Sequence, residues 1–205
     1  MRLAVFDTET TGFPLHPAAP LDKQPKIIEF AARVCTEHGP TDEAISFLCN
    51  PGEPITEEIT KITGIDDEMV EDKPHFNTRL QEVQDFFSSC HGVCAHNLPF
   101  DSQMVWFHVR SYGWEEKWIW PSIMLCTVQF YHHKYGRRPK LTQLYKDLIG
   151  EAYPQTHRAL DDVNALIEIV NHGEVFETLS AFENKVGVYF SADICPDKLP
   201  RGRYR

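Results

Sequence analysis

Short apolar runs alternate with segments of helical periodicity along most of this chain. The apolar runs, bounded by turn residues, predict strands at Leu3–Phe6, Ile27–Thr36, Ala44–Cys49, Val93–Ala95 and Ile123–Cys126. Apolar positions at helical spacing predict helices at Glu57–Ile62, Phe76–Ser88, Pro99–Tyr112, Leu141–Ile149, Ala159–His172 and Val175–Asn184. This alternation predicts an α/β sandwich.

Two carboxylates directly follow the first predicted strand. Asp7 and Glu9 are two residues apart, and side chains on a strand alternate between faces, so both project to the same side. Like charges at that separation repel, and a divalent cation between them relieves the repulsion. Gly12 lets the backbone turn away, and the backbone amides of Thr10 and Thr11 can then face a ligand oxygen. Alone, this segment also fits a solvated acidic turn.

A second acidic position, Asp101, ends the segment His96-Asn97-Leu98-Pro99-Phe100-Asp101. Pro99 suits the start of a helix, which places Asp101 in the first helical turn. Met104 and Val105 continue the same helical face, so we expect Asp101 to point inward. The alternative is an acid that only complements the helix dipole.

A histidine and two adjacent acids open the predicted helix that begins at Ala159. His157 before the helix and an acid in its first turn can converge on one point. The alternative is a helix-start charge at Asp161 or Asp162 and a histidine on the surface. Together the three clusters supply four acids and a histidine, as a two-metal phosphoryl-transfer site requires.

In their order and spacing, the clusters resemble the three motifs of the DnaQ-like 3′→5′ exonucleases, whose best-known member is the proofreading subunit of bacterial DNA polymerase III. The motifs read Asp-x-Glu-x-Thr-Gly, His-Asn-x-x-Phe-Asp and His-x-Ala-x-x-Asp, and the resemblance runs from Leu3 to Ile169. It implies a ribonuclease H-like mixed five-stranded sheet with helices on both faces. Thr63 stands where the family often has a histidine, which alters a family-typical contact with the terminal nucleotide.

The resemblance also assigns roles to the motif residues. The implied ligands of two divalent cations, Mg²⁺ or Mn²⁺, are Asp7, Glu9, Asp101 and Asp162. His157 would be the general base, and its place five residues before the last acid is typical of the histidine (DEDDh) branch of the family. In the tyrosine branch a tyrosine would occupy the position of Arg158. The motif spacing excludes Asp161, which we expect to be a helix-start charge.

These roles define a hydrolytic reaction. A phosphodiester is anionic, so attack on it needs positive charge and a source of hydroxide near neutral pH. Histidine is suited to accept the proton of the attacking water. By resemblance, the backbone around Thr10 would hold the terminal 3′-hydroxyl, so cleavage should begin at a 3′ end and release 5′-mononucleotides.

Substrate contacts are expected from the loops around the motifs and from basic stretches. The predicted substrate-binding residues are Thr10, Thr11, Gly12, Asn97, Arg137 and Arg138. The stretches His132–Lys140 and Lys198–Arg205 mix cations with aromatic residues, as grooves for single strands do, although each also fits a solvated segment. The formal net charge of −10 partly reflects the metal-site acids.

Length and composition fit one catalytic domain. With 205 residues, 42% of them hydrophobic, the chain can bury a sizeable core. We expect an exonuclease domain at 1–172 and a C-terminal extension at 173–205, helical and then basic, with no assigned role. The sequence shows no signal peptide or membrane-spanning run, and its six scattered cysteines suit reduced thiols, so we expect a cytoplasmic protein.

Several alternatives stay open. The motif opening favours single-stranded DNA ends over RNA, but an exoribonuclease of the same family has the same chemistry. A polymerase partner and the oligomeric state cannot be read from the sequence. A haloacid dehalogenase-type phosphatase also starts with a strand and an acidic pair, but it leaves the second and third clusters unexplained. A non-catalytic nucleic-acid-binding module would not need every catalytic position filled.

Overall fold

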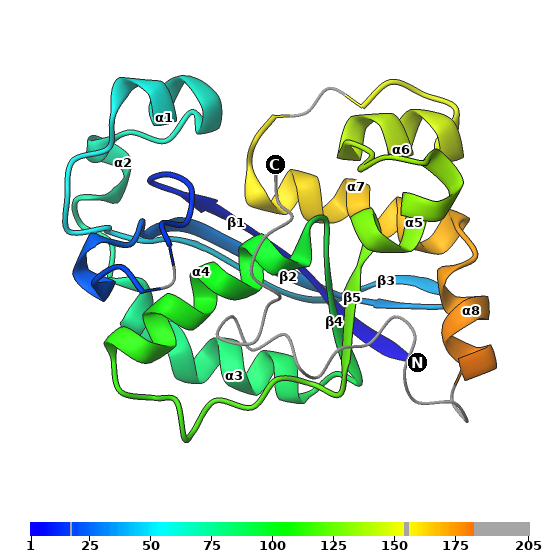
Figure 1. Ribbon diagram of the computed structural model, residues 1–205, viewed down its shortest axis with the longest axis horizontal. Helices are drawn as coiled ribbons and strands as arrows, with labels where there is room; N and C mark the ends of the chain where they lie inside the picture. The colour runs from blue at the N-terminus through cyan, green and yellow to red at the C-terminus, as the bar shows by residue number, and fades with distance from the viewer. Residues whose placement is uncertain (17, 154–155, 183–205) are drawn as a thin grey trace.

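A five-stranded mixed sheet forms the centre of the computed structural model, which describes residues 1–16, 18–153 and 156–182 (Figure 1). The strands are β1 (Arg2–Thr10), β2 (Ile27–Thr36), β3 (Gly39–Leu48), β4 (Gly92–Ala95) and β5 (Ile123–Cys126). Their order is β3-β2-β1-β4-β5, in which β1 pairs antiparallel with β2 and parallel with β4. The predicted mixed sheet is confirmed.

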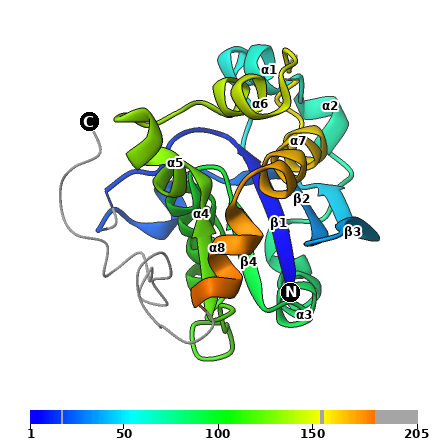
Figure 2. The same ribbon diagram turned by 90° about the vertical axis from the view of Figure 1, so that its right-hand side faces the viewer.

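Helices cover both faces of this sheet (Figures 1 and 2). The helices are α1 (Glu57–Thr63), α2 (Asp67–Val70), α3 (Leu80–Ser88), α4 (Leu98–Ser111), α5 (Thr127–Tyr135), α6 (Leu141–Ile149), α7 (Ala159–His172) and α8 (Val175–Phe182). Short 3₁₀ helices span Leu21–Lys23 and Phe76–Arg79.

The alternation of β1 decides which layer its acids face. Phe6 is buried in the core with α3, where its ring lies 5.0 Å from that of Phe87, whereas Val5 is buried in the core with α7. Asp7 and Glu9 continue the alternation of Val5. Both acids therefore face the α7 layer, as the strand periodicity predicts.

Several elements differ from the sequence prediction. β1 continues through Asp7 and Glu9 to Thr10, the short helix α2 is additional, and the segment predicted as one helix at Phe76–Ser88 begins as a 3₁₀ helix. β3 begins at Gly39, earlier than predicted, because it is an edge strand whose first residues are polar and largely exposed. The helix α5 was not predicted, and its Val128 and Tyr131 are buried. The basic stretch from His132 is therefore helical up to Tyr135, and Gly136, in the left-handed conformation with φ 62°, ends the helix.

The described C-terminal helix packs on the same core as α7. Val175 and Leu179 of α8 are buried beside Val170. The end of the predicted helix at Asn184 and the basic tail from Lys198 lie outside the described residues. Within the described ranges, no helix is long and apolar enough to cross a membrane.

Candidate active site

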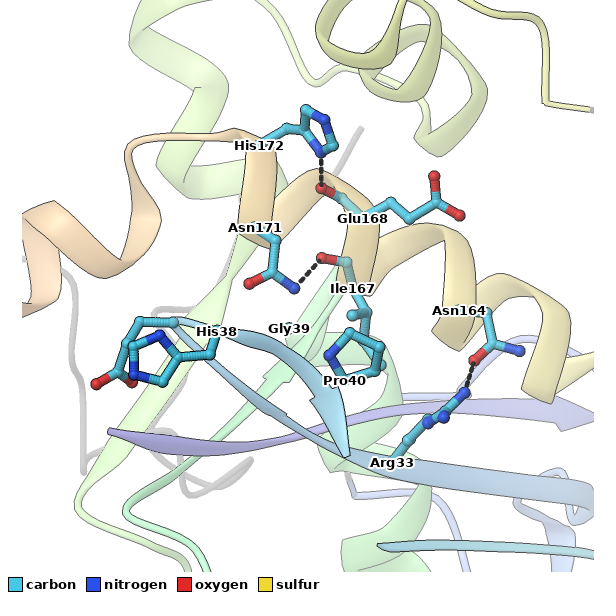
Figure 3. Close-up of a pocket in the computed structure, with 10 residues that line it drawn as sticks. Arg33, His38, Gly39, Pro40, Asn164, Ile167, Glu168, Asn171 and His172 are labelled. Atoms are coloured by element: carbon cyan, nitrogen blue, oxygen red, sulfur yellow. Dashed lines mark hydrogen bonds between the residues drawn. The ribbon is translucent and has the colours of Figure 1, made fainter. Parts of the chain in front are cut away.

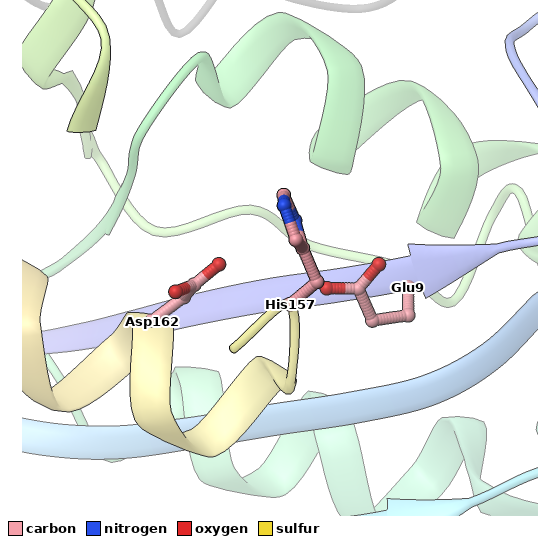
Figure 4. A group of neighbouring side chains, drawn as sticks. All are labelled: Glu9, His157 and Asp162. Atoms are coloured by element: carbon pink, nitrogen blue, oxygen red, sulfur yellow. The ribbon is translucent and has the colours of Figure 1, made fainter. Parts of the chain in front are cut away.

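Glu9, His157 and Asp162 come together where β1 meets the start of α7 (Figure 4). One ligand atom from each of them lies within 4.8 Å of the others. Asp162 is only 6% exposed, and Glu9 and His157 are half-buried. The carboxylate oxygens of Glu9 and Asp162 are suitable ligands for a divalent cation, so this cluster fits a metal ion with the imidazole beside it.

Asp7 lies beside this cluster on the same face of β1. Burial raises its pKa well above the usual range, and the negative charge of Asp101 raises it further, followed by that of Glu9. Burial also raises the pKa of Glu9 to about 8, with further contributions from neighbouring acids. Acids that raise one another's pKa in this way are stabilised in their charged form by bound cations.

Asp101 is held in place by Thr8. The backbone N–H and the hydroxyl of Thr8 both donate to Oδ1 of Asp101, at 3.1 and 2.7 Å. Asp101 is only 2% exposed, and burial raises its pKa to about 7 although these hydrogen bonds oppose the rise. It points inward as predicted. Thr8 was not among the predicted site residues, although its place between Asp7 and Glu9 turns its hydroxyl to the α4 layer.

Tyr153 is a second residue that the motifs do not contain. Its hydroxyl donates to Oδ1 of Asp162 at 2.8 Å, and the proximity of that carboxylate adds to the effect of burial in raising the pKa of Tyr153. The tyrosine therefore supports the orientation of Asp162. No sequence signal identified it, because it belongs to none of the three motifs.

Asn97 and His157 have left-handed backbone conformations, with φ 74° and 52°. Among the described residues, they are the non-glycine residues with positive φ. Asn97 directly precedes α4, and His157 lies two residues before α7. Such conformations cost about 1–3 kcal/mol and persist where surrounding contacts hold them. Backbone strain is thus concentrated at the second and third motifs.

Polar groups of the turn after β1 that were expected to face a ligand are hydrogen-bonded within the protein. The N–H of Thr11 donates to the carbonyl of Lys26 at 2.9 Å, so the expectation that this amide faces a ligand is wrong. The Thr11 hydroxyl donates to Glu53 at 3.1 Å, and that of Thr10 to the carbonyl of Gly12 at 2.8 Å. Gly12 does not have a positive φ, so the turn does not depend on the conformational freedom of glycine.

Phe13, directly after this turn, is a large aromatic side chain exposed to solvent. It is 85% exposed, and its ring centroid lies 6.1 Å from that of the half-buried Phe100 of the second motif. A large exposed aromatic ring on the loop after the first motif is a surface on which a base can stack. The sequence signal that could have identified Phe13 is its position directly after Gly12, the last residue of the first motif.

Two predicted substrate-binding residues meet near the second motif. Nη2 of Arg138 donates to Oδ1 of Asn97 at 2.5 Å, which joins the α5–α6 connection to the start of α4. Arg137 and Lys140 are exposed on the same connection. His96, also in the second motif, is partly buried, and its Nδ1 lies 3.0 Å from the Thr127 hydroxyl. This burial lowers the pKa of His96 to about 4.

Thr63, which stands at the position of a common family histidine, is buried and bonded locally. Its hydroxyl donates to the carbonyl of Ile59 at 3.0 Å and accepts from the N–H of Ile65 at 3.1 Å. It therefore stabilises the end of α1 and has no proton left to donate.

A separate hollow of about 540 Å³ lies between α7 and the β2–β3 hairpin (Figure 3). Arg33 spans it by donating to Oδ1 of Asn164 at 3.1 Å. Residues of the three motifs are absent from its described lining. The hollow is lined by α7 residues from Asn164 onward, whereas the motif cluster of Glu9, His157 and Asp162 lies at the start of α7 and is the candidate active site.

A family model described as an exonuclease matches residues 4–170. The chain therefore belongs to the exonuclease family, and its motifs are of the DnaQ-like, DEDDh type that the sequence indicates. It is 32% identical over 163 residues to the 3′-5′ exonuclease DinG of Bacillus subtilis (strain 168), covering 78% of this chain and 16% of that protein. It is 28% identical over 170 residues to the DNA polymerase III subunit epsilon of Haemophilus influenzae, covering 82% of this chain and 65% of that protein. The chain thus spans less than two thirds of the length of these relatives.

Solved structures confirm the ribonuclease H-like fold. Exonuclease X in complex with 5′ overhanging duplex DNA matches with a TM-score of 0.57 at 25% identity, covering 82% of this chain and 91% of that chain. The nuclease domain of 3′hExo, a DEDDh family member bound to rAMP, matches with a TM-score of 0.64 at 17% identity. That match covers 88% of this chain and 92% of the other.

Proposed function

We propose that this chain is a 3′→5′ exonuclease that hydrolyses nucleic acid from a free 3′ end to 5′-mononucleotides with the help of two divalent cations. The observation that carries the proposal is the approach of Glu9, His157 and Asp162 to within 4.8 Å of one another in a domain of the exonuclease family. Asp7 and Asp101 extend the same acidic cluster.

The acids and the histidine have different roles in the proposed reaction. Asp7, Glu9, Asp101 and Asp162 would hold Mg²⁺ or Mn²⁺, directly or through water. When bound, the cations supply positive charge for the phosphodiester and make water more acidic. His157, next to Glu9 and Asp162, accepts the proton from the attacking water. The carboxyl of Asp101 is kept in place by Thr8, and that of Asp162 by Tyr153.

Single-stranded DNA is the proposed substrate. The relative named DNA polymerase III subunit epsilon and the neighbour in complex with 5′ overhanging duplex DNA support DNA as the nucleic acid. Phe13 offers a stacking surface, and Arg138 and Asn97 offer polar contacts to the strand. An exoribonuclease of the same family is the alternative. Its reaction would use the same acids, so only a direct comparison of DNA and RNA separates the two.

Digestion of end-labelled oligonucleotides tests this function. Matched single-stranded DNA and RNA carrying 5′ labels should give a ladder that shortens with time, whereas 3′ labels should be released at once as mononucleotides. Chelator and Asp7→Ala should abolish both signals. Faster loss of RNA than DNA would identify the exoribonuclease. Chelator-resistant cleavage, or early release of 5′ labels, would contradict the proposal.

A further inference from the structure

Glu29 is a buried carboxylate beside the site that belongs to none of the motifs. It lies on β2 directly opposite Glu9 in the antiparallel pairing, and it is 3% exposed. A buried charge is tolerated when it is paired and hydrogen-bonded. The partners of Glu29 lie in the two residues that follow His157.

Arg158 and Ala159 share the carboxylate of Glu29. Nη2 of Arg158 donates to Oε1 at 2.7 Å, and its Nε lies 3.1 Å from Oε2. The N–H of Ala159, the first residue of α7, donates to Oε2 at 2.9 Å. The Arg158 side chain makes no cap at this helix start, and Glu29 accepts a hydrogen bond from the N–H of the first helical residue, one of the groups that a helix start leaves without a partner inside the helix.

His157, which directly precedes Arg158 and Ala159, has a backbone conformation that neighbouring contacts must hold in place. His157 has φ 52°, a conformation that side-chain-bearing residues rarely adopt. Relaxation of that backbone would swing the imidazole away from Glu9 and Asp162. The contacts of Glu29 fix the chain immediately after His157 and so oppose this relaxation.

We infer that Glu29 and Arg158 form a positioning pair that holds His157 in its left-handed conformation, and so directs the imidazole to Glu9 and Asp162. The pair acts on the reaction through His157 and touches no reacting atom. This inference rests on the proposed role of His157 as general base. The same ion pair could instead serve stability alone, and the experiment must separate these two roles.

A double-mutant cycle between Glu29 and His157 separates them. Glu29→Gln keeps the size of the side chain and an acceptor for Ala159 but removes the charge that holds Arg158. The readout is the single-turnover rate on a 3′-hydroxyl DNA oligonucleotide with protein in excess. With His157 present, we expect Glu29→Gln to lower this rate roughly 10- to 100-fold. In the His157→Ala background, we expect the same change to cost less than about twofold.

Glu43→Gln is the matched control. Glu43 accepts two hydrogen bonds from the guanidinium of Arg2, at 2.8 and 2.9 Å, away from the site. This variant should leave the rate unchanged in both backgrounds. If Glu29→Gln is unfolded at the assay temperature, the cycle is repeated with Arg158→Lys. This variant keeps the positive charge but loses the two parallel hydrogen bonds of the guanidinium.

Two distinct failures can be told apart. An equal loss from Glu29→Gln with and without His157 would overturn the inference, because the pair would then act through stability or through Asp162. A full rate in His157→Ala alone would overturn the general-base assignment on which the inference rests.

Discussion

Asp161 and Asp162 are adjacent in the sequence but lie in different surroundings. Asp162 is 6% exposed and lies with Glu9 and His157, whereas Asp161 is exposed and accepts a hydrogen bond from the Thr156 hydroxyl at 2.8 Å. Adjacent residues of a helix point about 100° apart, so only one of the two acids can face β1.

This difference predicts opposite results for two alanine variants. Asp162→Ala should lose at least about 3 kcal/mol of transition-state stabilisation, roughly a hundredfold in kcat/KM, because it removes a charge from the metal cluster. Asp161→Ala should keep most activity. Steady-state assays of both variants provide the comparison, and an inactive Asp161→Ala beside an active Asp162→Ala would show that the third motif is misassigned.

Metal-free protein should lose stability as the pH rises toward 8. The pKa of Glu9 is raised to about 8, first by burial and then by Asp162 and Glu29, so folded protein keeps a proton that the unfolded chain has released. When the folded state binds more protons, the free energy of unfolding falls as the pH rises. Melting temperatures in chelator between pH 6.5 and 8.5 measure this fall. Burial lowers the pKa of His108 to about 3, so this residue gives an opposite slope that ends near the ordinary histidine pKa of about 6.5, at the lower edge of the window.

Glu9→Gln is the control for this pH dependence. The variant should melt at a higher temperature than the wild type at pH 8 in chelator and show a shallower pH slope, although it should be inactive. Added Mg²⁺ should raise the melting temperature of the wild type more than that of the variant. Identical slopes for the two proteins would assign the effect to other groups.

His157 should determine the acid limb of the kinetic pH profile. A general base must be neutral to accept a proton, so the rate of the wild type should fall in acid. His157→Ala should lower kcat roughly 10²–10⁴-fold with little change in KM, and this limb should disappear. A variant with the wild-type profile would place the base elsewhere.

The basic connection before α6 should affect binding more than chemistry. Neutralising Arg137, Arg138 and Lys140 should raise KM and flatten its dependence on salt, because each lost phosphate contact removes about one unit of counterion release. Deletion from Lys198 should have a weaker effect or none. KM measured against salt on one oligonucleotide compares the variants, and equal salt slopes would show that neither segment contacts the strand.

The parts of the fold that local patterns determine were predictable from the sequence. The bounds of β2 and α7 match the prediction, because a mainly apolar run interrupted by Glu29 and Arg33 identifies the strand and a regular amphipathic stripe identifies the helix. Strand alternation placed Asp7 and Glu9 on one face, and a helix start placed Asp101 inward. α5 escaped prediction because its buried Val128 and Tyr131 are interspersed with polar residues.

The supporting contacts of the site could not be predicted in this way. Glu29 meets Arg158 across 129 positions of sequence, through a strand register that no local pattern specifies. Thr8 likewise bonds to a partner 93 positions away, and Tyr153 bonds to a partner nine positions away that no sequence periodicity relates to it. The motifs thus indicated which residues carry the chemistry, and the tertiary structure shows what holds them.

The choice between linear and circular substrates tests the central claim most directly. Purified protein with Mg²⁺ is incubated with one single-stranded DNA sequence in three forms: linear with a 3′-hydroxyl, linear with a 3′-phosphate, and covalently closed. We expect 5′-mononucleotides from the 3′-hydroxyl form alone, because an added 3′-phosphate meets the negative charge of Glu9 and a closed circle offers no end. Cleavage of the closed circle would contradict the account.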